Sequence, residues 1–283
     1  MLGQRIVTAV VLLAVLAATL ASANPWWFVA LLALGAACAA WEWLRLTLPP
    51  GATVIAVGVP ALLFLAMLWL ADVWLRGQGE AIYVTAWVVR GLIPAVAAIW
   101  VLGAFGAVYR GRADADPVSL GWSVFAVFAV LAAWSALALF FVLRGPVYVV
   151  SLLALVWVAD IAAYFAGRAF GKRKLAPKVS PGKTVAGAVA GVAGAVLWTV
   201  GSGYFPGTFG QDLLSRGLGL AIPAAALLGV LSIVGDLFES LLKRRAGRKD
   251  SSNLLPGHGG VYDRIDAVLP VAPVALLMSG VLF

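Results

Sequence analysis

Charged side chains are scarce in this sequence. Asp, Glu, Lys and Arg make up 11% of its 283 residues, whereas hydrophobic residues make up 63%. Ordinary soluble domains carry about 25% charged and roughly 45–50% apolar residues, and so little charge cannot cover a water-facing surface of this size. The composition therefore excludes a soluble domain and a disordered chain, and it indicates that lipid surrounds most of the protein.

Cysteine and histidine are scarcer still, with one residue of each. Cys38 lies alone in an apolar run, so an intramolecular disulfide is excluded. A zinc site built from cysteine and histidine is excluded as well, because His258 has no second ligand of these types.

Long apolar runs dominate what is present, and a helix needs about 20 apolar residues to span a bilayer. We predict an all-α polytopic membrane protein of about nine transmembrane helices, because strands of alternating polarity are absent. The first run has a rival interpretation as a signal peptide, although the second run follows so closely that a helical hairpin is favoured. The predicted spans lie near residues 6–23, 27–44, 52–71, 91–108, 120–142, 147–166, 184–200, 217–237 and 267–283.

Basic residues support this topology. With the N-terminus in the cytoplasm, 16 of the 20 Lys and Arg residues fall in cytoplasmic segments, as the positive-inside rule requires. Of the 32 charged residues, 20 lie between Asp160 and Asp266. We therefore treat 1–283 as a single membrane domain, with residues 1–146 mainly scaffold and residues 147–283 the catalytic half.

Four acids lie in the apolar runs, where ionisable residues are costly and usually functional. Glu42 stands near Arg45 at the end of a run, and we expect a simple interfacial ion pair there. Asp160 has no nearby cation in sequence, and Asp236 and Glu239 end the eighth run. These three are predicted to belong to a functional site.

The eighth run also places complementary groups on one helix face. Asp236, Ser240 and Lys243 are separated by four and three residues, so their side chains project together. Carboxylate oxygens with few other protein ligands suit Mg²⁺, especially when a substrate phosphate completes the coordination shell. We predict a magnesium site near the cytoplasmic end of this helix.

The next segment, from Lys249 to Asp266, combines glycines with polar residues. Gly259 and Gly260 could let the backbone approach a phosphate, and Arg264 could bind phosphate oxygens. Asp263 and Asp266 could hold a metal ion. A plain cytoplasmic turn would explain the glycines but not the neighbouring aspartates.

A second basic segment covers residues 167–184. Its Gly-Lys-Thr is not a P-loop, because Pro177 stands where the first glycine is required and no strand precedes it. Positive-inside charge alone could explain its lysines. The run from Ser180 to Thr184 is expected to enter a helix whose N-terminus binds phosphate.

At this point a resemblance can be stated. Ser240, Lys243-Arg244, Lys249-Asp250 and the run Leu255–Asp266 are similar to the signature of phosphatidate cytidylyltransferases, also called CDP-diacylglycerol synthases. Asp160, Gly167-Arg168 and the run Lys178–Thr184 also resemble that family. The similarity covers roughly the C-terminal 125 residues, and the preceding part is merely compatible.

The resemblance implies a Mg²⁺-dependent nucleotidyltransferase that moves CMP from CTP to phosphatidate, giving CDP-diacylglycerol and pyrophosphate in phospholipid biosynthesis. It implies a homodimer in the bacterial inner membrane, with the active site facing the cytoplasm and no nucleic-acid partner. The implied metal ligands are Asp236 and Asp263. The implied catalytic residues are Asp236, Ser240, Lys243, Lys249, His258, Asp263, Arg264 and Asp266, and the implied substrate-binding residues are Asp160, Arg168, Lys178, Ser180, Lys183, Gly259 and Gly260.

Three alternatives stay open at this point. A related cytidylyltransferase could act on another lipid phosphate. An ion-coupled transporter would use buried carboxylates, but no internal repeat is evident and the charges gather on one face. A CDP-alcohol phosphotransferase is disfavoured, because its motif begins Asp-Gly whereas Asp160 is followed by Ile161.

Overall fold

The computed structural model describes residues 2–77 and 79–279. Helices dominate this part of the chain, and a single short hairpin interrupts them. In chain order the elements are α1 (Leu2–Ala21), α2 (Trp26–Thr47), α3 (Thr53–Arg76), α4 (Glu80–Trp87), η1 (Val88–Leu92), α5 (Ile93–Ala98), η2 (Ile99–Ala104), α6 (Phe105–Arg110), α7 (Leu120–Arg144), α8 (Pro146–Phe170), β1 (Lys174–Ala176), β2 (Ser180–Thr184), α9 (Val185–Ser202), α10 (Phe209–Leu214), α11 (Leu218–Arg245), α12 (Tyr262–Ile265) and α13 (Val268–Met278).

Seven helices in the described part are long and apolar enough to cross a membrane. They correspond to seven of the nine predicted spans, with α4 to α6 forming one continuous span, Ala81–Arg110. The first predicted span overlaps α1, a helix of 20 residues, and the ninth overlaps α13, which has 11 residues, or roughly 16 Å at 1.5 Å per residue. Residues 280–283, which complete the ninth predicted span, lie outside the described residues. The prediction of an all-α polytopic membrane protein is confirmed.

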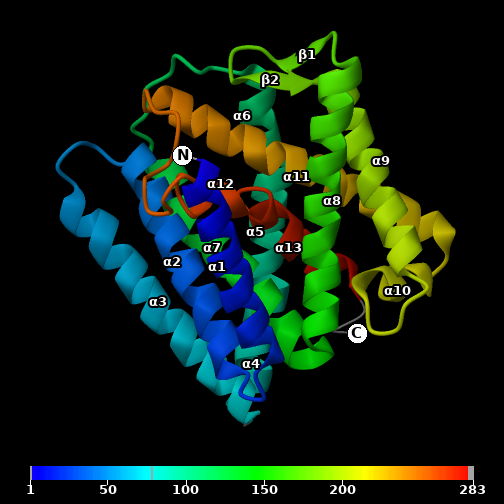
Figure 1. Cartoon of the computed structure of the whole chain (residues 1–283). Helices are drawn as coiled ribbons and strands as arrows, with labels where there is room; N and C mark the ends of the chain where they lie inside the picture. Colours follow the sequence, from blue (N-terminus) through cyan, green and yellow to red (C-terminus); the bar gives the residue numbers. More distant parts are fainter. Residues whose placement is uncertain (1, 78, 280–283) are drawn as a thin grey trace.

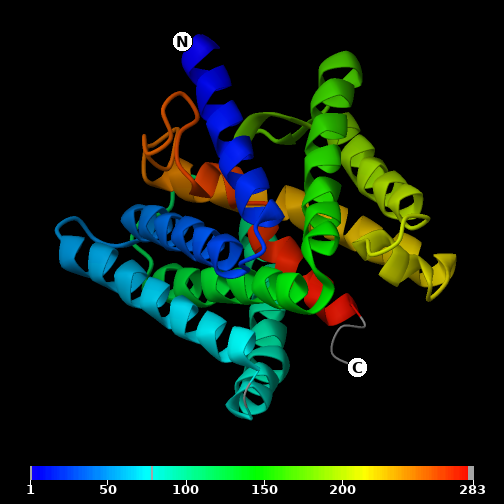
Figure 2. The same ribbon diagram turned by 60° about the horizontal axis from the view of Figure 1, so that its bottom comes forward.

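The helices form two groups around α13 (Figures 1 and 2). On one side α7 packs against α2, α3 and α13, and on the other α9 packs against α8 and α11. An aromatic cluster joins the groups: Trp43 of α2 and Phe238 of α11 have ring centroids 5.4 Å apart, and both contact Trp100. Large apolar side chains cover the outside, as lipid requires, and Leu62, Leu102 and Leu197 are each more than two-thirds exposed.

Glycines bring α8 and α9 close together. A Cβ added at Gly187 would lie 2.7 Å from the Ala163 carbonyl oxygen, and one at Gly191 would lie 3.1 Å from that of Ala159. Small residues at such crossings let two membrane helices approach closely. This packing places Ala159 and Ala163 of α8 against the start of α9, where the hairpin ends.

The run Ser180–Thr184 leads directly into helix α9, as expected, but is itself extended. It forms strand β2, which pairs antiparallel with β1 through Lys174 with Thr184 and Ala176 with Ser180. The Thr184 hydroxyl accepts a hydrogen bond from the Gly187 N–H at 3.1 Å and caps α9. The helix therefore begins only at Val185, and a protein hydroxyl satisfies one of its first free N–H groups.

The two basic segments lie at the same end of the molecule. Figure 1 shows the hairpin and the segment that joins α11 to α12 in the upper part of the molecule, near the start of α1. The alternation of helices thus brings together the segments that the distribution of lysine and arginine assigned to one side of the membrane.

Candidate active site

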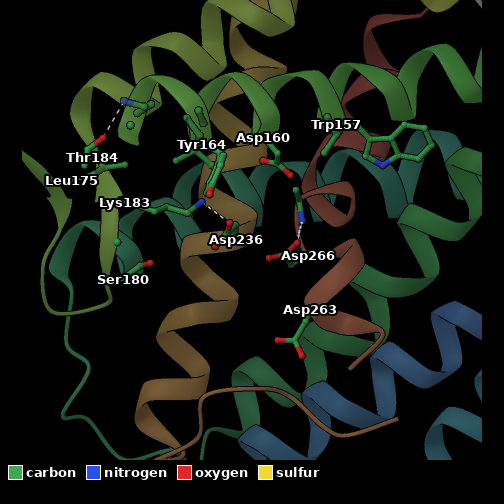
Figure 3. A pocket seen from close by; sticks show the side chains of 18 of the residues that line it. Trp157, Asp160, Tyr164, Leu175, Ser180, Lys183, Thr184, Asp236, Asp263 and Asp266 are labelled. Atoms are coloured by element: carbon green, nitrogen blue, oxygen red, sulfur yellow. Dashed lines mark hydrogen bonds and ion pairs between the residues drawn. The ribbon is translucent and has the colours of Figure 1, made fainter. Parts of the chain in front are cut away.

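A cavity of about 750 Å³ lies between α8, the hairpin, α9, α11 and the α12 region. Figure 3 shows acids entering it from three elements: Asp160 from α8, Asp236 from α11, and Asp263 and Asp266 from the α12 region. The basic residues Arg168, Lys183 and Arg264 also line it, as does Ser180. Carboxylates and cations from segments far apart in sequence thus share one polar space beside membrane helices.

Asp236 joins α11 to the hairpin. Its Oδ2 lies 2.5 Å from Lys183 Nζ, and the Ser240 hydroxyl, one turn further along α11, lies 3.4 Å from Oδ1 (Figure 3 shows the ion pair). Both side chains of the ion pair remain about a third exposed toward the cavity. Lys183 can therefore reach either Asp236 or an anion in the same space.

Asp263 is held by more donors than any other acid of the cavity. Lys243 Nζ lies 2.6 Å from its Oδ1, while the Gly260 N–H donates at 2.7 Å and the Ser251 N–H at 3.0 Å to its Oδ2. Burial alone would raise the pKa of Asp263, but hydrogen bonds with Glu239, Lys243 and the Gly260 N–H, together with the Lys243 charge, hold that pKa well below its usual range. Asp263 is therefore ionised at neutral pH.

Lys243 bridges two acids on neighbouring segments. Its Nζ lies 2.6 Å from Glu239 Oε2, one turn earlier on α11, and 2.6 Å from Asp263 Oδ1. Glu239 is almost completely buried. The predicted helix face of Asp236, Ser240 and Lys243 is thus present, but Lys243 also ties α11 to α12.

Asp266 differs from Asp263 in its surroundings. Its Oδ1 accepts a hydrogen bond from the Ala267 N–H at 2.8 Å, and burial together with the nearby charge of Asp236 raises its pKa well above the usual value. The pKa of Asp263 is therefore lowered and that of Asp266 is raised, although the two residues are only three positions apart.

The remaining predicted residues are divided among neighbouring spaces. Lys249, His258 and Gly259 line a second cavity of about 700 Å³, and Arg264 lines both cavities. The Arg264 guanidinium donates to the His258 carbonyl oxygen at 2.5 Å through Nη2. Lys178 lies along a third, mainly apolar cavity of about 830 Å³ beside α6 and α11.

Gly260 has a partner that sequence reasoning did not foresee. Its N–H donates to Asp263, a protein carboxylate, where a phosphate was expected. An added Cβ would press against the Ser251 hydroxyl and come within 2.5 Å of Glu42 Oε2, so this position has room only for glycine.

Asp236 and Asp263, the predicted metal ligands, carry carboxylate oxygens of the kind that Mg²⁺ prefers. Within residues 2–77 and 79–279, no three His, Cys, Asp or Glu side chains gather closely enough to hold an ion without other ligands. Asp236 and Asp263 nevertheless line one cavity. One or two carboxylates completed by waters and substrate phosphates is a common Mg²⁺ arrangement, so these residues fit such an ion when substrate is present.

Glu42 is the main residue that sequence reasoning placed wrongly. It makes no ion pair with Arg45, whose guanidinium carbon lies 4.6 Å from the centre of the Trp41 ring. Glu42 is instead fully buried and accepts hydrogen bonds from the segment 251–262. The signal was a carboxylate between two tryptophans in an apolar run, which the nearby arginine masked.

Fold and cavity together define a polytopic helical membrane protein whose cavity pairs carboxylates with lysines beside two basic segments. Residues 3–282 match the model of the cytidylyltransferase family, and the chain belongs to that family. The family assignment confirms the predicted nucleotidyltransferase class. The alternative of an ion-coupled transporter is therefore set aside.

Two relatives match nearly the full chain, and a third matches about two thirds of it. The chain is 38% identical to a phosphatidate cytidylyltransferase of Pseudomonas aeruginosa over 97% of its length and 95% of that protein. It is 33% identical to one of Haemophilus influenzae over 96% of each chain. It is also 36% identical to one of Thermotoga maritima over 62% of this chain and 67% of that protein.

Proposed function

We propose that the protein transfers CMP from CTP to phosphatidate, forming CDP-diacylglycerol and pyrophosphate. The observation that carries this proposal is the cavity in which Asp236 and Lys183 face Asp160, Asp263 and Asp266. Carboxylates suit a divalent cation and lysines suit phosphate oxygens, and this combination is what a triphosphate and a lipid phosphate require. Near full-length similarity to proteins named phosphatidate cytidylyltransferase supports the choice of substrates.

An adjoining space supports a lipid substrate. The apolar cavity beside α6 shares Leu175, Ala188 and Ile233 with the polar cavity, so the two meet at the hairpin. Arg110 and Lys178 lie among its apolar lining residues. The acyl chains of phosphatidate would lie along this apolar cavity while its phosphate enters the polar one, and Lys178 would attract the anionic head group.

Chemistry in this site needs no covalent protein intermediate. An oxygen of the phosphatidate phosphate attacks the α-phosphorus of CTP in line, and the bond from that phosphorus to the bridging oxygen breaks as pyrophosphate leaves. Positioning and charge neutralisation supply most of such catalysis. Asp236 and Asp263 would hold Mg²⁺, which supplies positive charge to the pyrophosphate oxygens.

The other predicted residues take binding roles in this proposal. Lys183, Ser180 and Arg168 contact phosphates from the hairpin side, and Lys243 and Ser240 do so from α11. Asp160 and Asp266 orient these groups. Lys249, His258, Gly259 and Arg264 form the second cavity, which would receive the remaining part of CTP, and Gly260 holds Asp263.

We further propose a homodimer in the bacterial inner membrane with this cavity facing the cytoplasm. The clustering of both basic segments at one end of the molecule supports the orientation (Figure 1). Chemical crosslinking in membranes that yields only monomer would contradict the dimer.

The deciding experiment uses purified protein in detergent with Mg²⁺, radiolabelled CTP and a panel of lipid phosphates. Phosphatidate should yield labelled CDP-lipid, and chelation of divalent cations should stop the reaction. A product formed only with an ether-linked or isoprenoid lipid phosphate would move the assignment to another lipid. No product with any lipid would contradict the enzyme proposal.

A further inference from the structure

Glu42 links the N-terminal half of the chain to the segment that carries Asp263. It lies on α2, more than 200 residues away in sequence, and its carboxylate is fully buried. Oε1 accepts from the Ser252 hydroxyl at 2.5 Å and from the Val261 N–H at 3.0 Å. Oε2 accepts from the Ser251 hydroxyl at 3.1 Å and from the Tyr262 N–H at 2.6 Å.

These contacts bind both ends of one loop to one carboxylate. Ser251 and Ser252 begin the loop, and Val261 and Tyr262 end it at the start of α12. The ring of Trp43, next to Glu42 on α2, stacks on Tyr262 with centroids 5.1 Å apart and planes 9° apart. The loop is therefore closed and docked by neighbouring side chains of a single helix.

Ser251 carries the connection onward to the cavity. Its buried hydroxyl lies 3.1 Å from Glu42 Oε2 and 2.9 Å from Asp263 Oδ2, so it stands between the two carboxylates. The Ser251 N–H adds a hydrogen bond to Asp263 at 3.0 Å. The single hydroxyl proton can serve one carboxylate at a time, so displacement of Ser251 would remove the N–H donor of Asp263 and the hydroxyl that the two carboxylates share.

A glutamate is the residue that this arrangement requires. Each of its oxygens faces two donors, and only a carboxylate offers acceptors on both. Glutamine would turn one oxygen into an N–H₂ that faces a backbone N–H, and aspartate is one methylene shorter. A buried donor left without a partner is costly.

We propose that Glu42 is a positioning residue: it holds the loop 251–262 so that Asp263 faces the cavity with its donors in place. This inference rests on the proposed function for its kinetic consequence, but not for its structural one. Under this proposal the N-terminal half, which was expected to be mainly scaffold, takes a direct part in organising the site.

The test compares Glu42→Gln with Thr47→Val in the full-length protein. Thr47 is buried on the same helix, and its hydroxyl lies 2.8 Å from that of Ser123, away from the loop. Thr47→Val thus removes a buried hydrogen bond of α2 without touching residues 251–262. It controls for general destabilisation of the helix.

Two readouts are measured. Hydrogen exchange without substrate should accelerate in residues 251–262 of Glu42→Gln and stay unchanged there in Thr47→Val. Turnover of CTP and phosphatidate should fall about 10- to 100-fold in Glu42→Gln, as is typical when a group that orients a ligating carboxylate is lost, and half-maximal turnover should need more Mg²⁺. Thr47→Val should keep turnover within about threefold of wild type.

Unchanged exchange in the loop of Glu42→Gln, or turnover equal to that of Thr47→Val, would overturn the proposal. If Glu42→Gln does not fold, Ser251→Ala decides instead: it removes only the hydroxyl between the two carboxylates and should lower turnover about tenfold in protein that still folds. Normal turnover in Ser251→Ala would contradict the link. Wild-type protein without activity but with the expected exchange pattern would contradict the proposed function alone.

Discussion

Lys183 Nζ lies 2.5 Å from Asp236 Oδ2, and this pair joins the hairpin to the membrane helix α11 across the cavity. The lysine lies on β2, which pairs with β1 and ends at Thr184, the cap of α9. A local turn thus sets the position of a cation that the proposed reaction needs.

Lys183→Met should lower kcat/KM for CTP about 100-fold, because it removes a cation from the cavity while its aliphatic stem is kept. Steady-state kinetics at saturating phosphatidate measures this. Lys172→Met, an exposed lysine just before β1, serves as the control for loss of basic charge. Equal kinetics of the two variants would show that Lys183 does not contact substrate.

Lys243→Met should destabilise the protein by about 3–5 kcal/mol, because Glu239 and Asp263 would be left nearly buried without their shared cation. Thermal unfolding in detergent should show a lower midpoint, and adding Glu239→Gln should recover part of the loss. The exposed Arg248→Met should change stability by less than about 0.5 kcal/mol. A Lys243→Met variant as stable as wild type would show that the cluster is not ionised as described.

Asp263→Asn and Asp266→Asn should shift thermal stability in opposite directions at neutral pH. The pKa of Asp263 is held below its unfolded value of about 3.9, so its ionised form stabilises the fold above that pH, and the contribution disappears as pH falls through the lower folded pKa. The pKa of Asp266 is raised by burial, so its ionisation opposes folding as pH rises.

Melting temperatures from about pH 2 to about pH 8, on either side of the ordinary aspartate pKa of about 3.9, check this pair. Asp263→Asn should melt below wild type at the upper end and approach it on acidification. Asp266→Asn should melt above wild type at the upper end. Shifts of the same sign in both variants would contradict the assigned environments.

Gly235→Ala should destabilise the protein by about 1–3 kcal/mol through overpacking. An added Cβ would press on the Asp266 carbonyl oxygen and come within 3.0 Å of the Ala267 Cα, so α11 would be pushed from the start of α13. Gly219→Ala, on the same helix with nothing within 4 Å, should be neutral or slightly stabilising. A stable and active Gly235→Ala would contradict this close contact between α11 and the start of α13.

Much of the architecture could be predicted because its signals are local. A run of about 20 apolar residues indicates a helix that spans the membrane. The spacing of Asp236, Ser240 and Lys243 places their side chains on one face of a helix, whatever surrounds that helix. The distribution of lysine and arginine placed both basic segments at one end of the molecule, where the fold also places them.

Pairing between distant segments could not be predicted in the same way. Arg45 is three residues from Glu42, yet the carboxylate is used by a loop that begins at Ser251. Ser180–Thr184 contains proline and glycine and shows no alternation typical of a strand, yet it pairs with Lys174–Ala176. His258 and Lys249 stand close in sequence to Asp263 but line a different cavity.

By itself, the sequence determined that lipid surrounds the protein, that its fold is helical, which family it resembles and which residue types form the site. Each of these depends on composition or on spacing within one segment. Only the tertiary structure decided which partner each charge takes. A buried carboxylate must collect its donors wherever packing delivers them, and the donors of Glu42 come from the opposite end of the chain.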